Sequence, residues 1–230
     1  MKLRKIYEDE HLIAFNKPRG LLTVAAQGKQ PNLYDMVKAK YSDGKNKIMA
    51  LHRLDRDTSG VVLFSKTQKC YEEAVKNKKF TDVKKTYVAI VVGKMERPSA
   101  IIENPLPSRR DKKILIPAFT SFKVIKVYQL PMRESASLVQ IEILHGRKHQ
   151  IRIHFTSVRH PLLMDREYME RKRYKYFQKL IKLRHYFLHA KKMNFKHFIT
   201  GLPMEILADP VFELKEAEQK LGFFEPAYQK

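Results

Sequence analysis

The sequence predicts an α+β protein whose core is a mixed, mainly antiparallel β-sheet with flanking helices and loops. Two observations carry this prediction. Apolar runs and alternating apolar–polar segments typical of strands dominate the chain, and segments with helical spacing lie between them. The 230 residues are 43% hydrophobic and show no boundary in composition. We therefore expect a single folded domain over residues 1–230 with a substantial hydrophobic core.

The first part of the chain alternates predicted strands with a turn and a helix. Residues 6–15 are apolar enough for one or two strands, and Pro18 and Gly20 mark the turn that comes next. Residues 31–41 have apolar side chains at helical spacing. Residues 61–64 form a short apolar run between Gly and Ser, which is typical of a buried strand.

The middle of the chain supplies the strongest strand signals. Residues 86–92 are rich in β-branched side chains. Residues 121–130 and 137–144 alternate apolar and polar side chains, and the turn between them predicts an antiparallel hairpin. Residues 67–80 predict a basic helix, whereas the proline-rich and charged residues 97–118 predict loops and short strands.

The last part of the chain mixes helices with further strands. Residues 149–156 and the basic, aromatic-rich residues 166–187 predict helices. Strand-like segments follow at 188–195 and 203–208, and a last helix is expected near 210–221. These segments complete the expected α+β arrangement.

The charge of the chain points to a polyanionic partner. Lys and Arg number 46 against 24 Asp and Glu, which gives a formal net charge of +22. An enzyme of small metabolites does not call for such an excess, and nucleic acid is the commonest polyanion that explains it. The alternatives are a basic surface without a partner and binding to a membrane surface. No stretch approaches the roughly 20 apolar residues needed to span a bilayer.

Cysteine usage and the N-terminal residues predict a cytoplasmic protein. Cys70 is the only cysteine, so an intramolecular disulfide and a cysteine-based zinc site are excluded. The opening MKLRKIYEDEH has no apolar signal region. We expect a reducing, intracellular setting and, by default, a monomer.

Residues 50–60, ALHRLDRDTSG, place two carboxylates in a chain poor in acids. Asp55 lies between Arg53 and Arg56, which favour its charged form. A charged carboxylate suits a nucleophile or a general base. The alternative is an ordinary aspartate-rich turn whose arginines only neutralise it.

A second cluster, HGRKHQIRIH at residues 145–154, holds three His and two Arg. His145 and His149 are four residues apart, as in some metal sites, but the segment lacks the Glu of a zincin helix and its charge opposes a cation. A site for a phosphate or a catalytic carboxylate fits better. The alternative is a basic, exposed hairpin end.

Several segments lie in register along residues 6–207: IYEDEHLIAFNKPRGL at 6–21, HRLDRDTSGVVLFSK at 52–66, KTYVAIVVG at 85–93, GRKHQIRIH at 146–154, HPLLMDREY at 160–168 and FLHA at 187–190. Together they resemble the RluA-type family of RNA pseudouridine synthases. The resemblance implies the catalytic fold of these isomerases, without the separate N-terminal RNA-binding module that some relatives carry. His145, Arg159 and Met164 depart from the family pattern beside the expected site and leave the RNA substrate open.

The resemblance implies a reaction and its residues. The enzyme would break the N1–C1′ bond of a uridine in structured RNA and rejoin the uracil through C5, without a metal or cofactor. Asp55 is the implied essential residue, by attack on C1′ or removal of the C2′ proton. Arg152 is its implied salt-bridge partner, with Arg147 as a second candidate, and Asp57 is left a supporting role.

Further residues are implied to contact the RNA. Tyr87 resembles the tyrosine that stacks on the target base, although it also suits a strand core. Arg53 resembles the residue that enters the gap left by the flipped uridine, although pairing with Asp55 or a phosphate is also open. We expect further substrate contacts from a group of residues that share these motifs: Thr58, Lys85, Arg147, His149 and Gln150.

The segment 166–187 carries eight Lys and Arg interleaved with Tyr and Phe. It predicts phosphate contacts plus stacking surfaces, and neutralising Arg171, Lys172, Arg173 and Lys175 is expected to weaken RNA binding. The alternative is a solvated helix whose aromatic side chains lie in the core. Ribosomal RNA is favoured over transfer RNA as the substrate. A non-catalytic RNA-binding or ribosome-assembly module, and a metal-dependent nuclease, are the competing functions.

Overall fold

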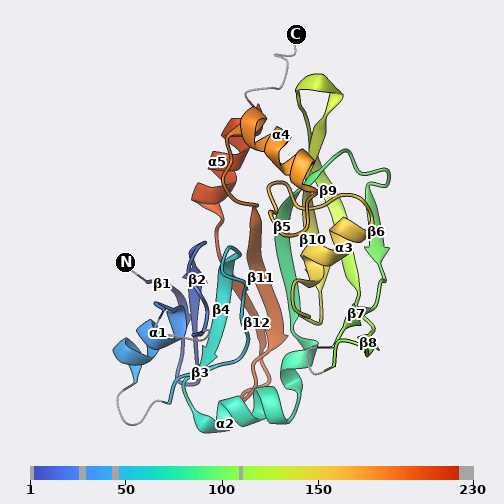
Figure 1. Cartoon of the computed structure of the whole chain (residues 1–230). Coiled ribbons are helices and arrows are strands. Elements are labelled where there is room, and N and C mark those ends of the chain that lie inside the picture. The colour runs from blue at the N-terminus through green and yellow to red at the C-terminus, as the bar shows by residue number, and fades with distance from the viewer. Residues whose placement is uncertain (1–2, 26–29, 43–46, 109–110, 223–230) are drawn as a thin grey trace. The chain divides into compact units, whose positions relative to one another are not determined.

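The computed structural model describes residues 3–25, 30–42, 47–108 and 111–222. The chain divides into two compact units, which can be followed by colour in Figure 1. Unit 1 comprises Met1–Thr86 and His189–Pro210, and unit 2 comprises Tyr87–Leu188 and Val211–Lys230. That the two units form a single domain stays a prediction.

The sheet of unit 1 is mainly antiparallel. Strand β2 pairs antiparallel with β1 and β4, β4 pairs in parallel with β11, and β12 pairs antiparallel with β11. A short strand, β3, pairs antiparallel with β4. The bounds are β1 Arg4–Glu8, β2 Leu12–Lys17, β3 Met49–Ala50, β4 Ser59–Ser65, β11 Leu188–Lys196 and β12 Pro203–Leu207. All of these strands except β3 overlap segments that the sequence predicts, and β1 begins two residues before the predicted one.

Gly60 allows β4 and β11 to approach each other closely. It has a φ of +113°, and a Cβ at this position would lie 2.2 Å from the carbonyl oxygen of Ala190. Only glycine fits both the backbone conformation and the space. The glycine at the end of the motif HRLDRDTSG is therefore required by the sheet that it enters.

Short helices cover unit 1. Helix α1 (Leu33–Tyr41) begins after Asn32, whose side chain accepts a hydrogen bond from the N–H of Asp35 at 3.0 Å. The helix predicted over residues 67–80 is divided into three: α2 (Gln68–Tyr71), a π-helical turn (Glu72–Lys76) and a 3₁₀ turn (Lys79–Asp82). Their apolar side chains join a core that includes Leu12, Leu63, Cys70, Ala74, Val83, Met193 and Phe198.

The longest strands of unit 2 fall on segments that the sequence predicts. Strand β5 (Lys84–Val92) carries the chain from unit 1 into unit 2, where the order is β5-β10-β9-β6. The predicted hairpin is confirmed: β9 (Thr120–Gln129) pairs antiparallel with β10 (Ser135–Ile143). Within residues 97–118 lie β6 (Ser99–Ile102), β7 (Leu106–Pro107) and β8 (Leu115–Ile116). Residues 109–110 are outside the described residues.

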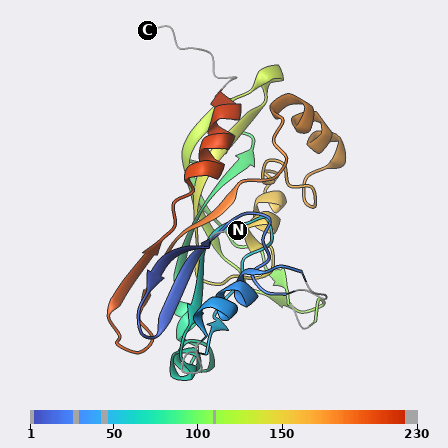
Figure 2. The same ribbon diagram turned by 90° about the vertical axis from the view of Figure 1, so that its left-hand side faces the viewer.

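The helices α3 (Gln150–Ser157), α4 (Arg171–Ile181) and α5 (Val211–Gly222) belong to unit 2. Figure 2 shows α5, in red, alongside the β9–β10 hairpin, where the hydroxyl of Tyr128 donates to Glu218 at 2.8 Å. Side chains of α4 and α5 share one core with the hairpin, including Tyr128, Leu138, Phe177, Ile181, Ala217 and Leu221.

The helix predicted over residues 166–187 is shorter than expected. It begins at Arg171 and ends at Ile181, where Lys182 takes a left-handed conformation with φ of 50°. Residues before it form a turn in which Asp165 is buried. The fold class is confirmed as α+β with a mixed, mainly antiparallel sheet. Among the described residues, no helix is both long and apolar enough to cross a membrane.

Candidate active site

Asp55 lies in a turn of unit 1 that leads into β4. The N–H of Thr58 donates to the carbonyl oxygen of Asp55 at 3.2 Å, which closes the turn. The side chains of Asp55 and Asp57 are half-buried, and Arg53 is exposed. Thr58 is buried, and its hydroxyl has no hydrogen-bond partner among the described residues.

The side chain of Lys17, in the NKPRG segment, holds this turn by hydrogen bonds to main-chain carbonyl groups. The Lys17 side chain is fully buried, and its Nζ donates to the carbonyl oxygens of Pro18 (3.0 Å), Leu21 (2.7 Å) and Arg56 (3.0 Å). The carbonyl of Arg56 also accepts from the N–H of Gly20 at 2.9 Å. Arg56 returns a bond from Nε to the Gly20 carbonyl at 3.1 Å. The NKPRG and HRLDRDTSG motifs are therefore joined to each other.

The residues on either side of the turn are held as well. The hydroxyl of Thr23 donates to the Leu54 carbonyl and accepts from the Leu54 N–H, both at 3.0 Å. On the other side, Ser59 Oγ and His189 Nδ1 are 2.8 Å apart, and His189 Nε2 contacts the carbonyl of Ala208 at 2.9 Å. The backbone that carries Asp55 is thus fixed before and after the turn.

His52, the first residue of HRLD, anchors the segment to β4. Its Nε2 accepts from the N–H of Leu63 at 3.0 Å, and its ring stacks on Phe80 with centroids 5.4 Å apart. Burial lowers the pKa of His52 to about 3, and the nearby charge of Lys85 acts in the same direction. His52 is therefore neutral at physiological pH and serves as a hydrogen-bond acceptor, a role that the sequence did not reveal.

Lys85 is a predicted substrate contact, and its side chain is buried in unit 1. Its Nζ donates to the Val83 carbonyl at 2.9 Å and lies 4.9 Å from the centre of the Phe80 ring. Burial lowers the pKa of Lys85 to about 8. These contacts give Lys85 a structural role, and its contact with substrate stays a prediction.

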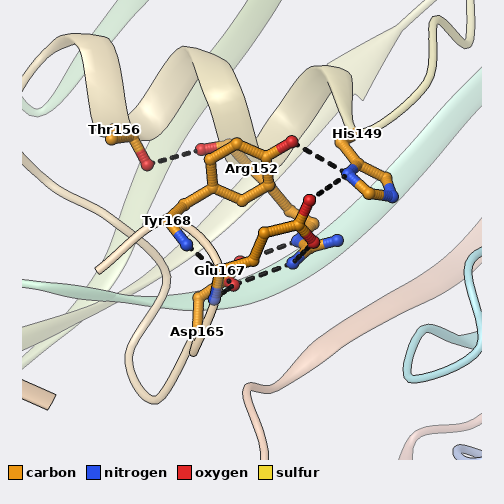
Figure 3. A network of polar contacts seen from close by, with 6 residues as sticks. All are labelled: His149, Arg152, Thr156, Asp165, Glu167 and Tyr168. Atoms are coloured by element: carbon orange, nitrogen blue, oxygen red, sulfur yellow. Dashed lines mark hydrogen bonds and ion pairs between the residues drawn. The ribbon is translucent and has the colours of Figure 1, made fainter. Parts of the chain in front are cut away.

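Arg152 in unit 2 is held by a pair of carboxylates (Figure 3). Its Nε and Nη2 donate to the two oxygens of Asp165 at 2.7 and 2.8 Å, and Nη2 also donates to Glu167 at 3.0 Å. Asp165 is fully buried and Arg152 is 6% exposed. Burial acts against the charge of Arg152, but the bonds to Asp165 outweigh it and raise the pKa of the guanidinium.

Two tyrosine rings enclose the same guanidinium. Its central carbon lies 4.7 Å from the centre of the Tyr168 ring and 4.9 Å from that of Tyr186. The Asp165 carboxylate also accepts from the N–H groups of Glu167 and Tyr168, at 3.1 and 3.3 Å. Asp165 therefore shapes its own turn as well as holding Arg152. No role for it follows from the sequence, although it is the acid of HPLLMD.

The start of α3 positions His149 and Gln150. His149 Nδ1 lies 2.9 Å from the Tyr168 hydroxyl and 3.5 Å from Glu167 Oε1, as Figure 3 shows. Gln150 is buried and donates to the Phe119 carbonyl at 2.9 Å, while its Oε1 accepts from the N–H of Arg147 at 3.1 Å. Gln150 thus braces the segment. In the described part of the chain, Arg147 Nε is buried without a hydrogen-bond partner.

The predicted site residues divide between the two units. Arg53, Asp55, Thr58 and Lys85 belong to unit 1, whereas Tyr87, Arg147, His149, Gln150 and Arg152 belong to unit 2. The structure joins His149 to Arg152 through Glu167, and it gives Tyr87 a buried position on β5. The salt bridge between Asp55 and Arg152 stays a prediction. No group of three His, Cys, Asp or Glu side chains within the described ranges is arranged to hold a metal ion.

Comparison with known proteins identifies relatives over almost the whole chain. A model of the RNA pseudouridylate synthase family matches residues 11–157. The ribosomal large subunit pseudouridine synthase C of Vibrio vulnificus is 32% identical over 94% of this chain and 68% of its own length. The dual-specificity RNA pseudouridine synthase RluA of Vibrio cholerae is 31% identical, with 96% of this chain and 88% of its own covered.

Solved structures support the fold. The chain is similar to human RNA pseudouridylate synthase domain containing 1, with a TM-score of 0.75, 19% identity, and 95% of this chain and 87% of that one covered. The corresponding values for human RNA pseudouridylate synthase domain containing 4 are 0.73, 18%, 95% and 93%. At these identities the likeness bears on the fold alone.

Proposed function

Because the chain belongs to the RNA pseudouridylate synthase family, and is thus an isomerase that converts uridine to pseudouridine in RNA, we propose that Asp55 is its essential catalytic residue. The observation that carries this proposal is the fixed turn around Asp55. Lys17 and Thr23 bind the main chain of Arg56 and Leu54, the two neighbours of Asp55. A catalytic carboxylate gains most when its position is set before the substrate arrives.

The chemistry requires a charged carboxylate and nothing redox-active. In one route an Asp55 oxygen attacks C1′, the electrons of the N1–C1′ bond leave with the uracil, and the bond between Asp55 and C1′ breaks again when C5 attacks C1′. In the other, Asp55 removes the C2′ proton as the N1–C1′ bond breaks, so that a glycal forms, and Asp55 returns the proton to C2′ when C5 bonds to C1′. In both, the uracil turns, C5 loses its proton and N1 regains one. No cofactor enters this balance.

Arg152 and Tyr87 complete the proposed catalytic set. We assign Arg152 to a salt bridge with Asp55, which would keep the carboxylate charged. Its bidentate bond to Asp165 and the two tyrosine rings support this role because they fix the guanidinium plane. Tyr87 would stack on the target base, as the resemblance implies.

The remaining proposed substrate contacts have unequal support. Arg53 is exposed, which suits entry into the gap left by a flipped nucleotide. The Thr58 hydroxyl and Arg147 Nε are polar atoms that the described residues do not satisfy, which suits contacts with a ligand. For Lys85, His149 and Gln150 the assignment depends on the resemblance, since each makes contacts within its own unit.

The test of Asp55 uses its neighbour as a matched control. RNA labelled with tritium at uracil C5 releases the label when pseudouridine forms. We expect Asp55→Asn to slow this release by at least about 10³-fold, within the range lost with a general acid or base. Asp57→Asn changes an equally half-buried acid of the same turn and should stay within a few-fold of the wild type. Equal release from wild type and Asp55→Asn would refute the assignment.

For the substrate we propose structured RNA, with ribosomal RNA favoured over transfer RNA. The name of the Vibrio vulnificus relative refers to the large ribosomal subunit, whereas the RluA relatives are described as dual-specificity enzymes. We further propose a cytoplasmic monomer. Pseudouridines mapped in total RNA with and without the gene would identify the substrate, and a site lost only from transfer RNA would contradict the ribosomal preference.

A further inference from the structure

Helix α4 carries a row of cations along its outer side. Arg171, Lys175 and Lys179 are exposed and four residues apart, so they follow one face in steps of about 6 Å. We call these three residues the outer row. On the opposite side, Phe177 and Ile181 are buried in the core of unit 2, with Tyr174, Tyr176 and Leu180 packed against it. The helix is thus firmly seated, and its outer row faces away from the core.

Helix α5 packs on the same core and serves as a comparison, as a helix whose outer side faces only solvent. Its sequence, VFELKEAEQKLG, mixes three Glu with two Lys, and Lys220 pairs with Glu216 at 3.0 Å. The sequence of α4, RKRYKYFQKLI, has five cations and no acid. Like charges at i, i+4 repel, and cations in the first turn oppose the helix dipole. Solvation alone does not account for this arrangement, whereas an anionic partner does.

Two other cations of α4 have different surroundings. Arg173 is half-buried, pairs with Glu134 at 3.1 Å and lies 5.8 Å from the centre of the Phe177 ring. It fastens α4 to the β9–β10 hairpin. Lys172 lines a hollow together with the carboxylates Glu134 and Glu170. Both therefore fall outside the outer row, although the sequence groups them with Arg171 and Lys175.

The outer row fits phosphates rather than bases. The sequence predicts stacking surfaces in this segment, but Phe177, Tyr186 and Phe187 are buried, and Tyr174 and Tyr176 pack on the core. Proteins that bind single strands use exposed rings to stack on bases, and double-stranded RNA is recognised mainly through its backbone and shape. We propose that the outer row binds the phosphate backbone of a stem in the RNA substrate, an inference that rests on the proposed function.

The test is a salt titration of binding to a stem-loop RNA. The variant Arg171→Gln/Lys175→Gln/Lys179→Gln keeps good helix formers and removes three positive charges. The slope of log affinity against log salt should become shallower by roughly 2 to 3, because about 0.7–0.9 counterions are released per phosphate contact. Loss of like-charge repulsion predicts an unchanged or slightly higher melting temperature, which separates weak binding from unfolding.

The control removes the same charge elsewhere. Lys123 on β9, Lys191 on β11 and Lys215 on α5 are also exposed, and their triple change to Gln should leave the slope nearly as in wild type. An unchanged slope in the α4 variant, or equal losses in the two triple variants, would overturn the proposal. So would a loss as large on an unstructured oligonucleotide as on the stem-loop, since the partner would then be a flexible strand.

Catalysis distinguishes this inference from the assignment of Asp55. With the α4 variant, the rate of tritium release at saturating RNA should match wild type while KM rises. Asp55→Asn should keep the wild-type salt slope and lose the release. If Asp55→Asn stayed active, the assignment of Asp55 would be wrong, and the proposal for the outer row would be unaffected. If only the slope test failed, the proposal for the outer row would be wrong, and the assignment of Asp55 would be unaffected.

Discussion

The turn around Asp55 in unit 1 and the guanidinium of Arg152 in unit 2 are both fixed, but by different means. Lys17, Thr23 and Gly20 hold the turn through main-chain carbonyl and N–H groups. Carboxylates and tyrosine rings hold the guanidinium through side chains. The position of Asp55 therefore depends on the path of the backbone. The position of Arg152 depends on charged side chains, so the loss of one of them directly destabilises the site.

Because the two places are held by different kinds of partner, substitutions in them are expected to cost different amounts of stability. A buried ion pair loses hydration, and its attraction compensates only when the geometry is good and the remaining donors are satisfied. The bidentate bond between Arg152 and Asp165, at 2.7 and 2.8 Å, meets that condition. The turn, by contrast, gathers several bonds to neutral carbonyls, each worth about 1 kcal/mol net. We expect single substitutions to harm the guanidinium site more than the turn.

The largest effect on stability is expected from Asp165→Asn. The change leaves the charge of Arg152 buried beside a neutral amide, and breaking a buried pair in this way costs about 3–5 kcal/mol. Urea unfolding measures the free energy directly. The control is Glu167→Gln, whose side chain is 56% exposed and should contribute no more than about 1 kcal/mol. Similar losses in both variants would contradict the distinction between Asp165 and Glu167.

Lys17→Met should have the next largest effect, and it tests the turn. Methionine keeps most of the packing but removes the donor for three carbonyls, so we expect a loss of about 3 kcal/mol in the free energy of unfolding. Pseudouridine formation should fall more than unfolding explains, because the turn that carries Asp55 loosens. Lys69→Met, at an exposed position on α2, should stay within about 0.5 kcal/mol of wild type. Equal stabilities of the two variants would remove Lys17 from this role.

The sequence predicts much of this fold because the relevant signals are local. Alternation over 121–130 and 137–144 predicts the β9–β10 hairpin, and the β-branched run over 86–92 predicts β5. The helix over 166–187 is predicted too long. Its basic, aromatic pattern extends beyond α4, but Asp165 turns inward to meet Arg152, and Lys182 ends the helix in a left-handed conformation. Those contacts depend on tertiary structure, which periodicity does not contain.

For the site, too, local sequence signals identify some residues, whereas the roles of others depend on tertiary contacts. Motifs alone single out Asp55, Arg152 and the NKPRG segment, since each lies in a short sequence pattern. Yet Lys17 meets Arg56 across 39 positions in sequence, and Gln150 meets Phe119 across 31. Which polar side chain serves the substrate and which braces the backbone is decided by such distant partners. Interpreting the motif as a set of substrate contacts therefore overlooks the bracing role of Gln150.

The smallest expected effect, and the sharpest test of the turn, is the pH dependence of His52. Its neutral ring accepts from the Leu63 N–H, and burial lowers its pKa from 6.5 to about 3. Between these values the unfolded chain binds a proton that the folded protein excludes. The stability that His52 gives is thus complete above pH 6.5 and is lost as pH falls toward 3, which amounts to about 2 kcal/mol between pH 7 and pH 5.

His52→Gln separates this titration from the other groups that respond to acid. Glutamine can still accept a hydrogen bond but does not titrate, so urea unfolding at pH 7, 6 and 5 should show the advantage of wild type over the variant shrinking as pH falls. His185→Gln, at an exposed position, controls for the substitution itself. Parallel curves for wild type and His52→Gln would mean that His52 does not anchor the HRLD segment as a neutral acceptor. The stability of the turn would then depend on the hydrogen bonds of Lys17 and Thr23.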